Sequence, residues 1–283
     1  MHAIDHSEEK YQDLRKRLDP FFADILERIA EYNKTYNKDL LQQAYEFGLW
    51  AHRNQARKSG EPYFEHCLHV ALLLTELRMD SVTIAAALLH DVVEDTGYTR
   101  EDIAEGFGDD VALLVDGVTK ITEFSGIKNL GYESRQAETF RKMLLSMAKD
   151  VRVIIIKFAD RLHNMRTLQH VPAKNRIRIS IETRDVYAPL AHRFGMAKIK
   201  SELEDLAFKY TRNKEFTELA NRLNQKREMR EAYVKTIVKP IKVDLKEHKI
   251  DAEVFGRPKH ISSIFRKMTV RNKPFEEIYD LFA

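Results

Sequence analysis

The sequence predicts a mainly α-helical protein, with an incomplete α/β segment at the end of the chain. Apolar residues recur at spacings of three and four along most of its 283 residues, which is the pattern of amphipathic helices packed around a core. Residues 250–255 instead alternate apolar and polar side chains like a strand. The length allows two domains or one large one, and no stretch approaches the length needed to cross a bilayer.

Composition excludes several classes of protein. The 47 basic and 44 acidic side chains leave a formal net charge of +3, which disfavours general nucleic-acid binding, although a local basic patch can still bind phosphate. Cys67 is the single cysteine, so an intramolecular disulfide and a thiolate zinc site are excluded. No apolar run follows Met1, so we expect no signal peptide and a reducing, cytoplasmic setting.

Local signals place the elements along the chain. Pro20 suits the first turn of a helix, Thr99 to Asp102 resembles a capping box, and Gly195 is a suitable helix stop. Residues 57–62 predict a loop with a basic start, and residues 121–132 predict another. Helical spacing predicts helices over 19–32, 39–52, 63–77, 136–148, 151–168, 179–190, 201–210 and 216–247, the last kinked or broken at Pro240.

The most informative stretch runs from Leu88 to Thr96, where an apolar helix pattern meets four ionisable side chains. On a continuous helix His90 lies one turn before Glu94, and Asp91 one turn before Asp95. Three carboxylates and an imidazole at the end of an apolar helix repel one another and are costly to desolvate. A divalent cation would remove that conflict, which indicates a metal-dependent hydrolase. The alternative is a solvated acidic helix end.

Two other helices carry residues that a metal site would need. His66 and His69 lie three apart among apolar neighbours, so one can face the core and the other the solvent, and a lone histidine on such a face is more often a core residue than a ligand. In the helix predicted over 151–168, Asp160 shares a face with Asn164 and Thr167. An unpaired carboxylate in so apolar a run is destabilising, and a metal bound by His90 and Asp91 would supply its partner.

Longer motifs surround these residues and carry a family resemblance. They are Arg57-Lys58-Ser-Gly-Glu-Pro, Ala87-Leu-Leu-His-Asp-Val-Val-Glu-Asp-Thr96, Ala159-Asp-Arg-Leu-His-Asn-Met-Arg-Thr167 and Pro189-Leu-Ala-His-Arg193. His66, His90-Asp91 and Asp160 resemble the ligands of the HD superfamily of metal-dependent phosphohydrolases. The motifs are similar to those of the Rel/Spo homologues, the bifunctional (p)ppGpp hydrolase/synthetases. Gly256-Arg-Pro-Lys-His260, with Ser263 and Lys267, resembles the start of their synthetase domain.

This resemblance implies hydrolysis of the 3′-pyrophosphate of (p)ppGpp to pyrophosphate and GDP or GTP, in the stringent response. His66, His90, Asp91 and Asp160 would hold Mn²⁺, since imidazole and carboxylate ligands suit this ion and leave positions for water and phosphate. Glu94 and Asp95 would position and deprotonate the attacking water. The implied substrate contacts are Arg57, Lys58, Arg161, Asn164 and Thr167, and the implied nucleotide contacts of the synthetase are Arg257, Lys259, Ser263 and Lys267.

The resemblance also predicts the domain organisation. We expect a hydrolase domain at 1–196, a helical linker at 197–225 and the first part of a truncated synthetase domain at 226–283, with synthetase activity absent. Cys67 stands where the family usually has proline, and Asn54 and Thr139 replace its common glycine and asparagine. The expected partners are guanosine tetra- and pentaphosphate, GDP and GTP. Direct contact with nucleic acid or a membrane is not expected, and ribosome contacts would belong to a longer parent protein.

Three other functions stay open at this point. An HD nucleotidase would act on ordinary nucleotides. A non-catalytic regulator would bind a nucleotide as a signal, which Glu94 and Asp95 disfavour because extra carboxylates do not help to bind an anion. A nucleic-acid partner would use residues 174–178 and the later basic helix, with an affinity that falls steeply with salt.

Overall fold

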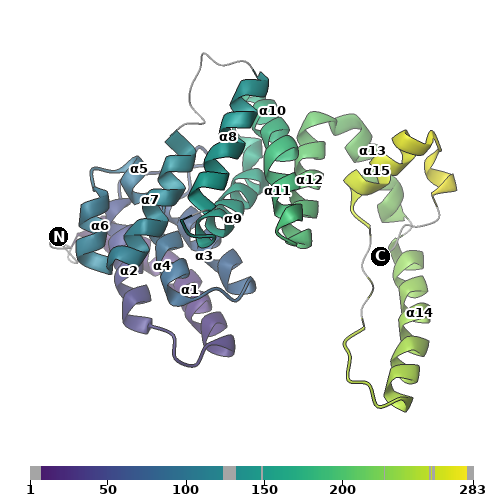
Figure 1. The fold of residues 1–283 in the computed structure, drawn as a ribbon, viewed down its shortest axis with the longest axis horizontal. Helices are drawn as coiled ribbons and strands as arrows, with labels where there is room; N and C mark the ends of the chain where they lie inside the picture. The colour runs from purple at the N-terminus through teal and green to yellow at the C-terminus, as the bar shows by residue number, and fades with distance from the viewer. Residues whose placement is uncertain are drawn as a thin grey trace. The chain divides into compact units, whose positions relative to one another are not determined.

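The computed structural model is helical throughout its ordered elements, and it describes residues 8–123, 132–147, 149–225, 227–254, 256 and 259–278. These residues contain no strand, so the mainly α-helical class is confirmed (Figure 1). The chain divides into two compact units, Met1–Ala173 with Asp185–Tyr187, and Lys174–Arg184 with Ala188–Ala283. The domain borders expected at 196 and 225 stay a prediction.

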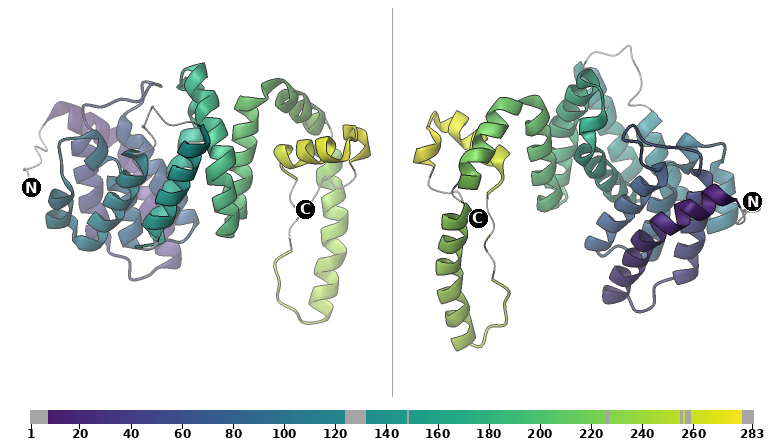
Figure 2. Two further views of the ribbon diagram at one scale, coloured as in Figure 1. Left: turned by 45° about the horizontal axis from the view of Figure 1, so that its top comes forward. Right: turned by 180° about the vertical axis from the view of Figure 1, so that it is seen from behind.

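The first unit is a bundle of helices in which α4 is the central element. α4 packs against α2, α3 and α7, while α3 also contacts α1 and α9, and the purple and blue segments of Figure 2 show this bundle from two further sides. The helices are α1 (Glu9–Tyr32), α2 (Lys38–Ala51), α3 (Tyr63–Glu76), α4 (Ser81–Leu89), α5 (Val92–Asp95), α6 (Arg100–Phe107), α7 (Asp109–Glu123), α8 (Tyr132–Met147), α9 (Arg152–Arg166) and the short 3-10 turn η2 (Leu168–His170).

α4 is central because its sequence is apolar on every side. Asp80 begins the helix by accepting a hydrogen bond from the backbone N–H of Thr83 at 2.8 Å, a standard N-cap. Helices that are apolar all round are buried, and eight of its nine residues are buried, Val82 being the exception. Gly48 of α2 allows close packing here, because a Cβ at this position would lie 2.4 Å from the Phe64 ring of α3.

Two expectations about these helices were wrong in detail. α1 begins at Glu9, so Pro20 lies inside the helix, because Tyr11 and Leu18 extend its buried face toward the N-terminus. The continuous helix expected from Leu88 to Thr96 ends at Leu89 and restarts at Val92. The reason is local: His90 Nδ1 lies 2.8 Å from the Ala87 carbonyl, and a side chain bonded to a helix carbonyl competes with the next helical turn.

Other expectations were confirmed. Thr99 and Asp102 form a complete capping box at the start of α6, and Gly195 has a φ of +72° after the end of a helix. The helix predicted over 151–168 is α9 followed by η2. The loop expected at 121–132 is shorter, since α7 runs to Glu123 and α8 begins at Tyr132, and its residues 124–131 lie outside the described residues.

The second unit is also helical. Its apolar cluster consists of Phe208, Leu219, Leu223, Ile264 and Phe275. Its elements are α10 (Ala173–Glu182), the π-helical turn η3 (Thr183–Tyr187, partly assigned to the first unit), α11 (Ala188–Arg193), α12 (Ala197–Thr211), α13 (Asn213–Gln225), α14 (Arg227–Glu247), α15 (Ile261–Arg271) and the 3-10 turn η4 (Phe275–Glu277).

Two predictions for this unit were wrong. The break expected at Pro240 does not occur, because α14 continues through this residue to Glu247, while the kink stays a prediction. Residues 250–254 do not form the expected strand, because a strand needs a neighbour to pair with and the described residues offer none. Across the described part of the chain, no helix is both long and apolar enough to span a membrane.

Candidate metal centre

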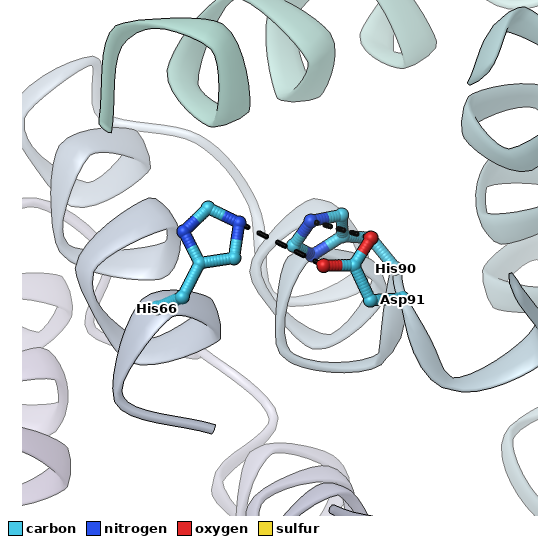
Figure 3. A group of neighbouring side chains, drawn as sticks. All are labelled: His66, His90 and Asp91. Carbon is cyan, nitrogen blue, oxygen red and sulfur yellow. Dashed lines mark ion pairs between the residues drawn. The ribbon is translucent and has the colours of Figure 1, made fainter. Parts of the chain in front are cut away.

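Three side chains from two places in the sequence converge inside the first unit. His66 lies on α3, whereas His90 and Asp91 form the junction between α4 and α5. Each offers a ligand atom within 4.8 Å of the others. The Asp91 carboxylate contacts both rings, with Oδ1 3.2 Å from His90 Nε2 and Oδ2 3.7 Å from His66 Nε2 (Figure 3). All three residues are almost inaccessible, so these ligand atoms face one another in the protein interior.

The hydrogen bonds of His90 determine which of its nitrogens carries a lone pair toward the site. A carbonyl oxygen can only accept, so the contact of 2.8 Å with Ala87 requires His90 Nδ1 to donate. In the neutral ring Nε2 is then an acceptor. Among the described residues this buried Nε2 has no hydrogen-bond partner, and an orphaned buried nitrogen beside a carboxylate fits a metal ligand.

Asp160 reaches the same place from α9. Its Oδ1 lies 3.3 Å from His66 Nε2, although it is not one of the three residues that meet the mutual distance of 4.8 Å. Both of its oxygens have donors, because Lys157 Nζ lies 2.6 Å from Oδ2 and Asn164 Nδ2 donates to Oδ1. The sequence analysis identified Asn164 but not Lys157, although Lys157 lies one helical turn before Asp160.

Electrostatics show that this site attracts positive charge. Burial lowers the pKa of His90, but the neighbouring Asp91 outweighs it and raises that pKa well above the ordinary value. Burial likewise raises the pKa of Asp160, but Lys157 reverses the effect and holds it well below the ordinary range. Burial lowers the pKa of His66, which keeps this ring neutral and able to bind a cation. Two carboxylates and two imidazoles are ligands that divalent transition metals accept.

The two expected catalytic acids lie next to this centre. Glu94 and Asp95 are exposed on α5, directly after Asp91. Tyr63, which the sequence analysis did not identify, connects Asp95 to the centre: its Oη lies 2.6 Å from Asp95 Oδ2 and 2.8 Å from Asp91 Oδ2. Burial and Asp91 raise the pKa of Tyr63, so the phenol keeps its hydrogen and donates it. The sequence signal was its place one turn before His66 on α3.

The basic loop between α2 and α3 also reaches the centre. Arg57 is half-buried and donates from Nη2 to Asn164 Oδ1, while its Nη1 lies 3.3 Å from His163 Nδ1. Lys58 is exposed. His163, a second residue that sequence reasoning missed, also lies 2.7 Å from His66 between their Nδ1 atoms. Burial, assisted by His66, lowers the pKa of His163 to about 2, so this ring is neutral.

Two of the expected substrate contacts have other neighbours in this structure. The Arg161 guanidinium lies over the Tyr187 ring, 3.9 Å from its centroid. Thr167 ends α9 and donates its hydroxyl to the His163 carbonyl at 3.1 Å. The roles of Arg161 and Thr167 as substrate contacts stay predictions.

Of the residues expected to match the synthetase, Ser263 and Lys267 lie on α15 in the second unit and Lys259 lies just before it. Lys259 and the partly buried Lys267 are close enough for Lys259 to lower the pKa of Lys267 to about 8, and Ser263 lies in the first turn. Arg257 lies outside the described residues. The start of this helix is held by another side chain of the protein, because the Asp205 carboxylate accepts hydrogen bonds from the Ser262 N–H and from His260.

Known proteins share the sequence features of this centre. The sequence profile of the family described as HD domain matches residues 44–197, a range that contains every residue of the centre. The chain therefore belongs to the HD-domain proteins, the class that its helical bundle and its His66, His90 and Asp91 cluster define.

Curated relatives give a narrower assignment. The chain is 46% identical over 255 residues to a GTP pyrophosphokinase of Myxococcus xanthus, covering 90% of this chain and 34% of that protein. It is 46% identical over 245 residues to a probable guanosine-3′,5′-bis(diphosphate) 3′-pyrophosphohydrolase of Synechocystis sp., covering 86% and 32%. With its HD domain, the chain belongs to the Rel/Spo homologue family. It spans about a third of the length of these relatives.

Proposed function

We propose that this chain hydrolyses the 3′-pyrophosphate of (p)ppGpp, releasing pyrophosphate and GDP or GTP, with Mn²⁺ as the resident metal. The observation that carries the proposal is the convergence of two imidazole Nε2 atoms and the Asp91 carboxylate in a buried site. The proposal is further supported by the relative from Synechocystis sp. that is named for this reaction.

The residues present fit a metal of this kind. His90 Nε2 has no hydrogen-bond partner among the described residues, and it lies 3.2 Å from an oxygen of the Asp91 carboxylate, so a cation, whether a proton or a metal ion, is favoured between them. His66, His90 and Asp91 would hold the metal, with Asp160 completing the set. When bound, the metal would lower the pKa of a coordinated water and shield charge that builds on phosphorus.

The other residues of the site have separate tasks in this mechanism. Asp95, held by the Tyr63 hydroxyl, and Glu94 orient the attacking water and take its proton. Arg57 and Lys58 neutralise phosphate charge, and a guanidinium can do so with two parallel hydrogen bonds. Lys157 stays bonded to Asp160, so the carboxylate keeps its charge in a buried position.

The test compares Asp91→Asn with Asp109→Asn, the same change at an exposed aspartate at the start of α7. Asp91→Asn removes a ligand charge, so we expect Mn²⁺-dependent release of pyrophosphate from ppGpp to be lost. The control should keep full activity, and circular dichroism should show equal helical content in both. Unchanged turnover in Asp91→Asn would refute the proposal.

The choice of substrate separates the proposed reaction from that of a nucleotidase. The wild-type protein is offered ppGpp, dGTP and dAMP side by side with Mn²⁺. We expect pyrophosphate from ppGpp and little product from the other two. Faster turnover of dGTP or dAMP would favour an ordinary HD nucleotidase, and tight ppGpp binding with no turnover of any substrate would favour a regulator.

A further inference from the structure

His163 occupies a position between a proposed metal ligand and the basic loop. It lies on α9, one turn after Asp160, and is 8% exposed. Its Nδ1 contacts His66 Nδ1 at 2.7 Å and Arg57 Nη1 at 3.3 Å. Its ring stacks on His69, with centroids 4.8 Å apart and planes 17° apart. The ring therefore has fixed neighbours on one face and on its Nδ1 edge.

The two contacts of this one nitrogen determine where the hydrogens lie. A guanidinium has donors and no acceptor, so His163 Nδ1 must be the acceptor in its contact with Arg57. The contact between the two Nδ1 atoms also needs one donor, and that donor must then be His66. A neutral His66 that carries its hydrogen on Nδ1 has a lone pair on Nε2.

This tautomer is the one that a metal ligand needs. His66 Nε2 faces Asp160 Oδ1 at 3.3 Å and Asp91 Oδ2 at 3.7 Å. A lone pair opposite two carboxylates is favourable when a cation lies between them. With the opposite tautomer, His66 Nε2–H would donate to Asp160 and would be unable to bind a metal. His163 and Arg57 therefore select between two chemically different forms of the site.

Arg57 also reaches the other side of the centre. Its Nη2 donates to Asn164 Oδ1, which turns the Asn164 amide nitrogen toward Asp160 Oδ1. The Arg57 guanidinium thus contacts two proposed ligands indirectly. It reaches His66 through His163 and Asp160 through Asn164. The planar fork of arginine suits this double contact, and lysine would not reproduce it.

We propose that His163 is a positioning residue that, held as an acceptor by Arg57, fixes His66 in the tautomer whose Nε2 binds the metal. This inference rests on the proposed metal centre. Groups that orient a metal-bound histidine typically change metal affinity by about 10- to 100-fold when they are removed. His163 does not itself touch metal or substrate in this assignment, and it acts through His66.

The experiment uses the full chain and two substitutions of the same residue. His163→Leu removes the acceptor and keeps a similar volume. His163→Asn keeps an acceptor, because its Oδ1 can take the place of the imidazole Nδ1. Mn²⁺ affinity is measured by calorimetry, and the tautomer of His66 is measured by ¹⁵N NMR of the histidine rings in metal-free protein. His69→Leu is the control, because it removes the ring stacked on His163 and keeps the acceptor that His163 offers to His66.

We expect His66 to carry its hydrogen on Nδ1 in the wild type and in His163→Asn. In His163→Leu that hydrogen should move toward Nε2, and Mn²⁺ affinity should fall by about 10-fold or more. His163→Asn and His69→Leu should bind Mn²⁺ within a few-fold of the wild type. A structural role alone would lower the melting temperature of His163→Leu and leave affinity and tautomer unchanged, which would overturn the inference.

Three outcomes keep the tests of the two proposals distinct. A hydrogen on His66 Nε2 in the metal-free wild type would overturn the inference even if His163→Leu failed to fold. A wild-type chain that binds no Mn²⁺ would instead overturn the proposed function and, with it, the role assigned to His163. Wild-type Mn²⁺ binding with an unchanged His163→Leu variant would overturn the positioning role and leave the proposed function standing.

Discussion

Replacing Tyr63 with phenylalanine should separate metal binding from turnover. The change removes one oxygen that lies 2.8 Å from Asp91 and 2.6 Å from Asp95. The ring itself stays in place, because it stacks on His52 with centroids 4.9 Å apart. A phenol has one hydrogen for two carboxylates, so losing it frees Asp95 to turn away and leaves Asp91 with one partner fewer.

The magnitude follows from the charge of the acceptors. A hydrogen bond to a charged group contributes about 1.5–3 kcal/mol, which corresponds to a fall in rate of about 10- to 150-fold if the bond is fully used in the transition state. We expect kcat for ppGpp hydrolysis to fall within this range, while Mn²⁺ affinity changes by only a few-fold because the ligands remain.

Steady-state kinetics with ppGpp and calorimetry with Mn²⁺ measure the two effects. Tyr32→Phe is the matched control, since its hydroxyl donates to the Met79 carbonyl at 2.7 Å; this variant should lose about 1 kcal/mol of stability and no activity. A double-mutant cycle with Asp95→Asn should show strong non-additivity. Equal kcat in Tyr63→Phe and the wild type, or additive effects in the cycle, would refute the role given to this hydroxyl.

Two further predictions concern buried charge and a helix end. Lys157→Met leaves the buried Asp160 carboxylate without its cation, so the metal-free protein should lose about 3 kcal/mol of unfolding free energy. Mn²⁺ should restore part of this loss in a thermal melt. A loss that Mn²⁺ does not reduce would contradict the proposed metal site at Asp160. Asp205→Ala removes the carboxylate that holds the start of α15 and should cost about 1 kcal/mol without changing hydrolysis. Burial raises the pKa of Asp205, but His260 and Ser262 outweigh burial and lower that pKa. The stabilisation by Asp205 is therefore present above about pH 4 and is lost as pH falls through the lowered pKa. The difference in stability between wild type and Asp205→Ala should therefore vanish in acid.

The sequence alone predicted the helices of the first unit well, because their faces are regular. The capping box at Thr99 and the buried α4 follow directly from residue type and spacing. The break at His90 does not, because it results from one imidazole bonding to the Ala87 carbonyl. That competition depends on a rotamer, which a periodic pattern does not encode.

The sequence predicted which residues the candidate site contains better than it predicted the contacts between them. Lys157 and His163 lie one turn on either side of Asp160. Several other residues of that helix have equivalent spacing, so spacing alone does not single out these two. The contact between Arg57 and His163 joins residues 106 positions apart, and no local signal reports it. The strand expected at 250–255 failed for a related reason, because alternation describes one strand and says nothing of its neighbour.

The break between α4 and α5 has a consequence for how this catalyst can change. His90 is anchored at the end of a helix that the core surrounds on all sides, whereas Glu94 and Asp95 lie on a four-residue turn facing solvent. We expect substitutions on this turn to leave His90, a proposed metal ligand, undisturbed, since α4 ends at Leu89 and α5 begins at Val92. Substitutions of Glu94 are therefore expected to change the proposed hydrolysis more than the proposed binding of the metal.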